Sequence, residues 1–283
     1  MGRRDHARQH PVVIARTISA CIAELPATPG AGEDRARIAS TAVVVLDGAS
    51  GTGFGVSVCE YVDSLADHLV TALDSHPSIP LTSAVTAAIE HTTTACGLTP
   101  GHAPSSTVSI VRRGAETVDI LVLGDSPVYV SHLDKVDRVT DNRLKRLNLP
   151  SRTRVLARLA AGGGYDDTHA SNIRMLSSEK APHMNRSGGY WIAEADSAAG
   201  RHALVRSYPA NDVPWCAILT DGADDPLTQL GLSVVQVADL DEHDLRDMLH
   251  RLHDWEAVSD PDGHKLPRFK RHDDKTIAIV RFQ

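Results

Sequence analysis

The chain has 283 residues, of which 42% are hydrophobic and 23% are charged. This is ordinary globular composition, long enough to bury a sizeable core, and it excludes wholesale disorder. The 29 basic and 36 acidic residues give a formal net charge of −7, and aromatic residues make up only 4%. Both values argue against a protein built to bind nucleic acid.

The cysteines and the N-terminal segment bear on the cellular compartment. Cys21, Cys59, Cys96 and Cys216 lie far apart with no C-x-x-C pair, which predicts small core residues in a reducing compartment. No apolar run approaches membrane-spanning length, and the apolar stretch after the charged N-terminus stops at Arg16, which is too short for a signal peptide. The sequence therefore predicts a cytoplasmic protein without a membrane partner.

The first half of the chain predicts two strands, two helices and then a run of strands. Strands are expected at 12–19 and 41–46, joined by a surface connection at about 25–37 that is rich in Pro, Gly and charge. Apolar residues spaced three and four apart predict an antiparallel pair of helices at 58–73 and 81–96. Short strands at 107–111, 118–123, 127–132 and 136–140 have tight polar links, which predicts a meander of neighbouring strands.

The second half is expected to begin with a helical and loop-rich region at about 143–187. Strands follow at 190–195, 203–207 and 215–220, then a helix capped by Asp241, then a closing strand at 276–282. The tight links between strands favour antiparallel sheets with helices packed outside, an α+β layered sandwich. We find no internal repeat and no sign of a domain boundary, so a single domain over 1–283 is expected.

Acidic residues stand at the ends of four strongly apolar strands. Asp47, Asp125 and Asp221 follow such strands, and Asp273 precedes the last one. One Asp-Gly pair is ordinary turn chemistry, but strands fix their ends in space. If these ends meet at one edge, the carboxylates would repel one another by several kcal/mol unless something compensated. Oxygen-only ligands would select Mg²⁺ or Mn²⁺ over zinc.

Six segments carry a resemblance to a known family. In chain order they are Glu33-Asp34, Asp47-Gly48-Ala49-Ser50-Gly51, Ser106-Thr107-Val108, Gly124-Asp125-Ser126, Thr220-Asp221-Gly222-Ala223-Asp224-Asp225 and Asp273-Asp274-Lys275-Thr276. They resemble the motifs of the protein phosphatase 2C family, the metal-dependent serine/threonine phosphatases, from about residue 12 to the C-terminus. The resemblance implies one phosphatase 2C-like domain over 1–283, a four-layer α-β-β-α sandwich of two mainly antiparallel sheets flanked by helix pairs. A variable helical or flap region is then expected at about 143–190.

The resemblance also implies metal ions, site residues and a substrate. It implies two Mg²⁺ or Mn²⁺ ions, bridged by Asp47, and the matching ligands are Asp34, Asp47, Gly48 through its carbonyl, Asp221 and Asp273. The family's weaker third metal site is matched by Asp125, Asp221 and Asp225. Two ions about 4 Å apart would lower the pKa of a shared water, and the bridging hydroxide would attack phosphorus directly. The implied substrate is a phosphorylated protein.

Two positions depart from the family pattern. The arginine that grips the substrate phosphate is Pro29 here, so Arg35 or the nearby Arg37 would have to supply its fork, with Arg35 the candidate carried forward. An ordinary surface role for both is equally expected. A histidine that some members use as an acid is Ala49, although many bacterial-type members also lack it. The missing arginine leaves open an alternative, a pseudophosphatase that binds a phosphoprotein or signalling partner without turnover.

Two further residues are weaker candidates. His272 adjoins Asp273 and could support that ligand from behind, while Arg186 lies in a glycine-containing loop that could meet substrate. For both residues an ordinary structural role is the favoured alternative. The basic run at 268–271 could attract a phosphorylated partner or form a solvated loop.

Overall fold

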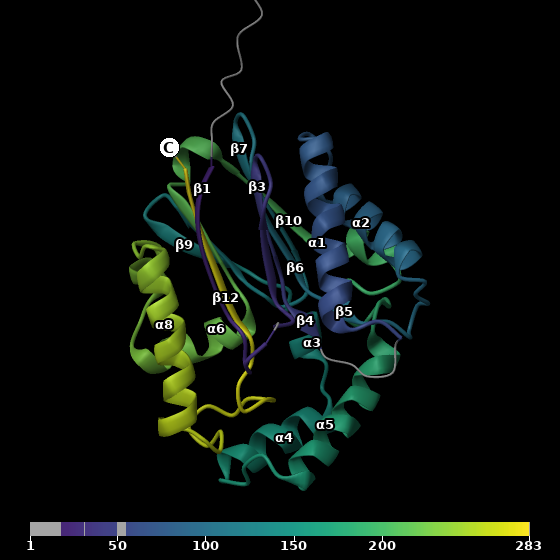
Figure 1. The fold of residues 1–283 in the computed structure, drawn as a ribbon, viewed down its shortest axis with the longest axis vertical. Helices are drawn as coiled ribbons and strands as arrows, with labels where there is room; N and C mark the ends of the chain where they lie inside the picture. Colours follow the sequence, from purple (N-terminus) through teal and green to yellow (C-terminus); the bar gives the residue numbers. More distant parts are fainter. Residues whose placement is uncertain (1–17, 31, 50–54, 283) are drawn as a thin grey trace, which may run out of the picture.

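The computed structural model describes residues 18–30, 32–49 and 55–282. Two five-stranded sheets stack face to face, and helices cover the outer face of each sheet (Figure 1). Every pair of neighbouring strands within these sheets is antiparallel. The predicted α+β fold, a four-layer α-β-β-α sandwich, is therefore confirmed.

The first sheet has the strand order β1-β12-β11-β8-β9. Its strands are β1 (Ile18–Leu25), β12 (Lys275–Phe282), β11 (Trp215–Leu219), β8 (Val128–His132) and β9 (Lys135–Val139). The helices on its outer side are α6 (Asp221–Leu227), α7 (Val234–Ala238) and α8 (Glu242–Asp254). Leu245 and Leu249 of α8 pack in one cluster with Leu219 and Ile277 of the sheet, and Asp241 caps α8 as predicted.

The second sheet has the strand order β10-β7-β6-β3-β2. Its strands are β10 (Leu204–Pro209), β7 (Thr117–Leu123), β6 (Val108–Arg113), β3 (Ala42–Leu46) and β2 (Arg35–Ile38). The predicted helix pair, α1 (Val58–Ser75) and α2 (Leu81–Ala95), covers its outer face. Helix α1 begins at a capping box in which Ser57 and Glu60 satisfy each other's backbone N–H groups.

The inner faces of the two sheets form a separate core. Val43 and Val45 alternate inward from β3 and pack with Ile120, Ile218 and Val280, all fully buried.

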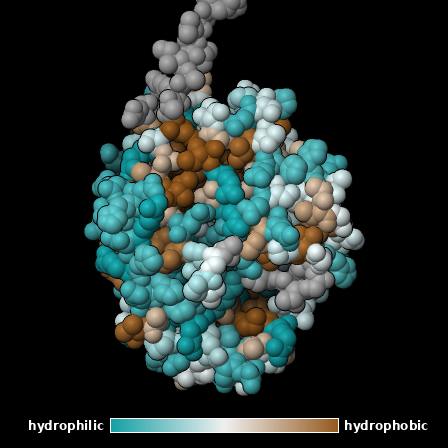
Figure 2. Space-filling view, in the orientation of Figure 1, coloured by the Kyte–Doolittle hydropathy of each residue, from teal (hydrophilic) through white to brown (hydrophobic). Residues whose placement is uncertain are grey.

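Figure 2 shows apolar residues gathered on the upper part of the molecule, whereas the visible lower surface is mainly hydrophilic. Among the described residues, no helix is both long enough and apolar enough to cross a membrane.

A third group of helices lies beyond one end of the sandwich, below it in Figure 1. These helices are α3 (Arg143–Arg146), α4 (Pro150–Ala160) and α5 (Asp167–Lys180), within the region predicted to be helical and loop-rich. They contact the loop that leads to β12, because His169 Nε2 lies 2.9 Å from the Phe269 carbonyl oxygen. Two short strands, β4 (Gly48–Ala49) and β5 (Ser105–Ser106), pair near the same end.

Several sequence-based boundaries are wrong. No strand forms at 190–195; Ala193 makes an isolated bridge to Ser106, and the backbone of Ile192 is held instead by the Asn185 side chain. The segment 25–37, predicted as a surface connection, contains the start of β2, because Arg35 pairs with Leu46. The first strand runs to Leu25, and the part of the predicted strand at 12–17 lies outside the described residues.

The predicted meander is also interrupted. Strands β6 and β7 pair, and so do β8 and β9, but β7 and β8 belong to different sheets. The chain crosses between the sheets at residues 124–127, where Gly124 has a φ of +92° that favours glycine. This crossover carries Asp125, so the strand change sets where that carboxylate lies.

Candidate metal centre

Five aspartates lie at one end of the sandwich because the strand register brings them there. In the second sheet Arg35 pairs with Leu46, so Asp34 before β2 and Asp47 after β3 leave the sheet side by side. In the first sheet Leu219 pairs with Ile277, so Asp221 after β11 lies near Asp273 before β12. The β6–β7 pairing of Val108 with Leu123 brings the end of β7, and hence Asp125, to the same end. We call Asp34, Asp47, Asp125, Asp221 and Asp273 the carboxylate cluster.

Hydrogen bonds from threonine and serine connect the two sheets at this cluster. Thr220 Oγ1 donates to Asp34 Oδ2 at 2.8 Å and accepts from the Thr276 N–H at 3.0 Å, which joins the end of β11 to the start of β2. Ser126 Oγ lies 3.3 Å from Asp47 Oδ2, within hydrogen-bond distance. The backbone carbonyl of Asp47 accepts from the Thr107 N–H at 2.9 Å. The carboxylates are thus held on backbone segments that support one another.

Two glycines in the recognised motifs are required by close backbone approach. A Cβ on Gly48 would lie 2.5 Å from the Glu33 carbonyl oxygen, and a Cβ on Gly222 would lie 2.0 Å from the Asp274 carbonyl oxygen. These separations are far below van der Waals contact, so a larger residue would push the neighbouring segments apart. Gly48 therefore allows Asp47 to approach the segment that carries Asp34. Gly222 likewise allows Asp221 to approach the segment that carries Asp273.

The electrostatics show that the carboxylates interact. Burial raises the pKa of Asp47 well above its ordinary value, and the charges of Asp221, Asp34, Asp273 and Asp125 raise it further. Burial likewise raises the pKa of Asp221, with additional repulsion from Asp273 and Asp125. Ionised carboxylates whose charges act on one another in this way repel, so the cluster favours protonation or a bound cation.

Asp34 is the deepest member, with a relative exposure of 7%. Burial raises its pKa to about 8, against the opposing hydrogen bond from Thr220, and the charges of Asp274 and Asp273 add to the rise. A cavity of about 80 Å³ adjoins Asp34 and Gly32. By contrast, Asp125 and Asp221 are open to solvent on one side, although the protein around their carboxyl groups still raises the pKa of both, so an ion or a substrate from solvent can reach the cluster.

The donor set fits a hard divalent cation. It consists of oxygen atoms only, and the Gly48 carbonyl lies directly after Asp47 in the chain. Mg²⁺ and Mn²⁺ prefer such oxygen ligands, and their charge would offset the repulsion that raises the carboxylate pKa values. The raised pKa values of Asp34, Asp47 and Asp221 are the observation that a bound dication would explain.

Two lysines that sequence reasoning did not select face the cluster. Lys270 Nζ donates to Asp273 Oδ1 at 2.7 Å and lies 4.0 Å from Glu33 Oε2. Burial lowers the pKa of Lys270, but the charges of Asp273, Asp47 and Glu33 outweigh this and raise it overall. Lys180, the last residue of α5, feels the charges of Asp125 and Asp221, although burial keeps its pKa below the ordinary value. The basic run around Lys270 was the only sequence signal for either residue.

Arg35, the sequence candidate for phosphate binding, is engaged elsewhere. Its Nε and Nη2 donate to the two carboxylate oxygens of Asp63 in α1, at 2.6 and 3.0 Å, and its Nη1 donates to the carbonyls of Gly32 and Asp34. Arg37 also contacts Asp63, at 2.9 Å. Both guanidinium groups therefore attach β2 and the Asp34 segment to α1.

The remaining sequence candidates take different positions. Asp225 in α6 is exposed, and burial of its carboxyl group raises its pKa, with a smaller rise from the negative charge of Asp125. The neighbouring Asp224 accepts hydrogen bonds from Tyr129 and Arg138 instead. His272 Nδ1 lies 2.9 Å from Glu256 Oε2, behind the Asp273 segment. Arg186 is exposed in the loop after α5.

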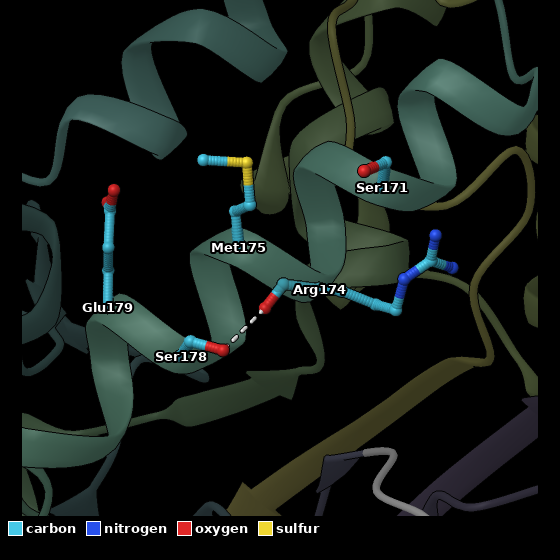
Figure 3. A pocket seen from close by; sticks show the side chains of 5 residues that line it. All are labelled: Ser171, Arg174, Met175, Ser178 and Glu179. Carbon is cyan, nitrogen blue, oxygen red and sulfur yellow. Dashed lines mark hydrogen bonds between the residues drawn. The ribbon is translucent and has the colours of Figure 1, made fainter.

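A hollow of about 440 Å³ lies on one side of α5, and none of its lining residues belongs to the carboxylate cluster (Figure 3). It is lined by Ser171, Arg174, Met175, Ser178 and Glu179. The carboxylate of Glu179 accepts from the Ser151 N–H at 2.9 Å and from the Ser151 hydroxyl at 2.7 Å. With its one acidic group so engaged, this hollow offers no comparable set of ligands.

Solved structures with a similar fold come from bacterial phosphatases. Serine/threonine phosphatase Stp1 from Staphylococcus aureus has a TM-score of 0.59 at 13% identity, covering 98% of this chain and 100% of that chain. The PPM Ser-Thr phosphatase MsPP from Mycobacterium smegmatis, in complex with cacodylate, has a TM-score of 0.54 at 17% identity, covering 95% and 100%. The catalytic domain of the phosphatase PstP, in complex with two manganese ions, has a TM-score of 0.51 at 14% identity, covering 93% and 97%.

The sequence itself matches no family model and no curated protein. The similarity to the solved structures nevertheless extends over nearly the whole chain, through both sheets and the helices around them. The fold implied by the phosphatase 2C resemblance is confirmed by this likeness. The chain has the fold of the bacterial serine/threonine phosphatases of the PPM type.

Proposed function

We propose that the protein is a Mg²⁺- or Mn²⁺-dependent phosphomonoester hydrolase that acts on phosphoserine or phosphothreonine in proteins. The observation that carries this proposal is the carboxylate cluster, five aspartates from five strand ends, in which burial and neighbouring carboxylates raise the pKa values of Asp34, Asp47 and Asp221. The fold, and the names of the proteins that share it, support the same function.

Each member of the cluster has a proposed role. Asp47, with the Gly48 carbonyl, would hold two ions, and Asp34, Asp221 and Asp273 would complete their coordination directly or through water. Asp125 and Asp225, which interact across the exposed side of the cluster, would serve a weaker third site together with Asp221. When bound, the two ions would supply a water acidic enough to attack phosphorus directly and would neutralise the phosphoryl oxygens.

Lys270 is a better candidate than Arg35 for binding the substrate phosphate. Its side chain is 42% exposed, and its ammonium group lies at the rim of the cluster beside Asp273. Arg35 is only 13% exposed and its partner, Asp63, lies on α1, whereas the partner of Lys270, Asp273, belongs to the cluster itself. An ammonium group can bind phosphate as a point charge in place of an arginine fork.

The test is release of phosphate from a phosphoserine peptide and from p-nitrophenyl phosphate. We expect activity with Mn²⁺ or Mg²⁺ that is abolished by EDTA and by Asp47→Asn or Asp221→Asn. The matched control is Asp134→Asn, which removes the same charge in the β8–β9 turn, at a positive φ that Asn tolerates. If the pure, metal-loaded protein leaves both substrates untouched, the proposed hydrolase activity is wrong.

The alternative, a pseudophosphatase, is favoured by one observation. Pro29 stands where the family has its phosphate-binding arginine, and both nearby arginines contact Asp63. Calorimetry with the same phosphopeptide separates the two functions. Binding without phosphate release would support the alternative, whereas turnover would exclude it.

A further inference from the structure

A buried ion pair lies directly behind the Asp273 segment. Lys275, the first residue of β12, has a relative exposure of 0%, and Glu256 has 1%. Lys275 Nζ donates to Glu256 Oε2 at 2.9 Å and to the backbone carbonyl of Asp273 at 3.0 Å. Glu256 lies on a short π-helical turn, Trp255–Ser259, which continues α8 and directs the carboxylate toward β12. The lysine therefore joins the backbone of Asp273 to the end of α8.

The same carboxylate also contacts the residue before Asp273. His272 Nδ1 lies 2.9 Å from Glu256 Oε2, and the His253 ring stacks on the His272 ring with centroids 4.1 Å apart. Glu256 is thus connected to the chain on both sides of Asp273, through His272 and through Lys275. On the far side, Asp274 accepts from the N–H groups of Ala27 and Glu33, next to Asp34.

His253, Glu256 and His272 have ligand atoms within 4.8 Å of one another, the spacing of a candidate metal site. The contact with Lys275 argues against a metal ion at this place. Its buried ammonium already neutralises Glu256, and a dication bound to that carboxylate would lie beside a desolvated positive charge. The cluster is better explained as a network that fixes the backbone around Asp273.

We propose that Lys275 and Glu256 are positioning residues that hold Asp273 in place to bind metal at the carboxylate cluster. This inference rests on the proposed function, because Asp273 is a proposed metal ligand. Residues that orient metal ligands typically contribute about 10- to 100-fold to metal affinity. Neither side chain is among the proposed metal ligands, and Lys275 contacts the backbone carbonyl of Asp273, so both would act through the backbone of Asp273.

The test measures Mn²⁺ binding by the electron paramagnetic resonance signal of free Mn²⁺, with thermal unfolding recorded in parallel. The variants are Lys275→Met, Glu256→Gln and the double variant Lys275→Met/Glu256→Leu. A buried ion pair can often be replaced by apolar residues without loss of stability, so the double variant is expected to melt near the wild type. We expect the double variant nevertheless to bind Mn²⁺ about tenfold more weakly than the wild type. The Mn²⁺ concentration that gives half-maximal activity should rise by a larger factor than the factor by which kcat falls.

The matched control is the double variant Arg112→Met/Asp119→Leu. In this partly buried pair Arg112 Nη2 lies 2.8 Å from Asp119 Oδ2. The pair lies at the end of the β6–β7 hairpin that is farther from the carboxylate cluster. It should leave Mn²⁺ affinity unchanged. Lys275→Arg, which keeps the positive charge, should recover part of the affinity lost in Lys275→Met.

Asp273→Asn separates the possible failures. If it weakens Mn²⁺ binding but the folded Lys275→Met/Glu256→Leu variant binds as the wild type does, the positioning role is wrong and the metal centre stands. If the wild type binds no Mn²⁺, the metal centre and the positioning role both fail. If Asp273→Asn binds Mn²⁺ as the wild type does, Asp273 is not a ligand and the positioning role fails, while a metal centre at the other aspartates stands. A Zn²⁺ equivalent that is lost in His253→Asn would also overturn the inference, because the network would then be a metal site.

Discussion

At the residue scale, the site depends on which side chains are already engaged. The fork of Arg35 is paired with Asp63, whereas the ammonium of Lys270 contacts Asp273 and stays accessible at the rim. Sequence reasoning selected Arg35 because it lies close in the chain to the missing arginine. It indicated the basic run at 268–271 but could not single out Lys270, because the ion pair of Lys270 with Glu33 joins loops more than 200 residues apart.

Lys270→Met is expected to weaken substrate binding more than it slows turnover. The variant keeps the length of the side chain but removes the charge proposed to bind the phosphate, so KM for a phosphopeptide should rise about tenfold, as for loss of a charge-assisted contact. The matched control is Lys265→Met in the same loop, where the side chain is exposed. Steady-state kinetics of both variants check this, and equal KM values would contradict the role of Lys270.

The raised pKa of Asp34 predicts a pH-dependent stability of the metal-free protein. The unfolded carboxyl has a pKa of about 3.8, whereas in the fold burial raises the pKa to about 8. Between these values the folded state binds the extra proton, so the stabilisation is present at low pH and is lost as pH rises toward 8. The melting temperature in EDTA should fall from pH 5 to pH 8, and should fall less in Asp34→Asn.

Differential scanning calorimetry of the two proteins at four pH values measures this difference. Addition of Mn²⁺ should restore stability most at the high end of the range, because metal binding requires the deprotonated carboxylate. Identical pH slopes for the wild type and Asp34→Asn would show that Asp34 is ionised in the metal-free fold.

At the element scale, the strand register carries the site. Asp47, Asp125, Asp221 and Asp273 could be selected from sequence because each stands at the end of an apolar strand, and strand ends are fixed by pairing. The strand beside Asp34 was missed because its sequence, Arg-Ala-Arg-Ile, has little apolar character and lies in a Pro- and Gly-rich stretch. The opposite error occurs at 190–195, where a strand was predicted but none forms. Its apolar residues are buried without pairing into a sheet.

Helix α6 was not predicted, because Asp-Gly at its start reads as a turn and Pro226 lies inside it. Its glycine gives an element-scale prediction. In an ordinary helix Gly→Ala stabilises by about 1 kcal/mol, but a Cβ on Gly222 would lie 2.0 Å from the Asp274 carbonyl. We therefore expect Gly222→Ala to lower the melting temperature and to weaken Mn²⁺ binding.

Thermal unfolding and a Mn²⁺ titration of Gly222→Ala check both effects. The control is Gln229→Ala, at an exposed position in the turn directly after α6, which should behave as the wild type does. If Gly222→Ala is more stable than the wild type and binds Mn²⁺ normally, the backbone at Asp274 can move to make room for the added Cβ, and the prediction is wrong.

At the scale of the whole molecule, the layer order was predictable and the assignment of strands to sheets was not. Apolar periodicity indicated which segments are helices and strands, and the tight links indicated antiparallel pairing. Tight links also made β7 and β8 look like neighbours, although the chain crosses between sheets at Gly124. A local pattern cannot show on which side of a core the next strand continues.

Stability and metal binding should be separable at this scale, because the core between the sheets and the carboxylate cluster are different regions. Ile120→Val removes one methylene from the fully buried core and should cost about 1 kcal/mol of unfolding free energy. Its Mn²⁺ affinity should equal that of the wild type when measured at about 20 °C, which is well below the unfolding temperature of an ordinary domain. Denaturant unfolding and a Mn²⁺ titration measure the two quantities, and a loss of affinity would mean that the core and the site are coupled.

We propose that the aspartates at one end of the sandwich together bind divalent metal for phosphate hydrolysis. The most direct measurement is anomalous diffraction at the manganese absorption edge from crystals grown with Mn²⁺. We predict two adjacent peaks between Asp34, Asp47, Asp221 and Asp273, with Asp47 in contact with both. Ordered carboxylates with no peak between them, or manganese bound only elsewhere on the chain, would show that the cluster is not a metal centre.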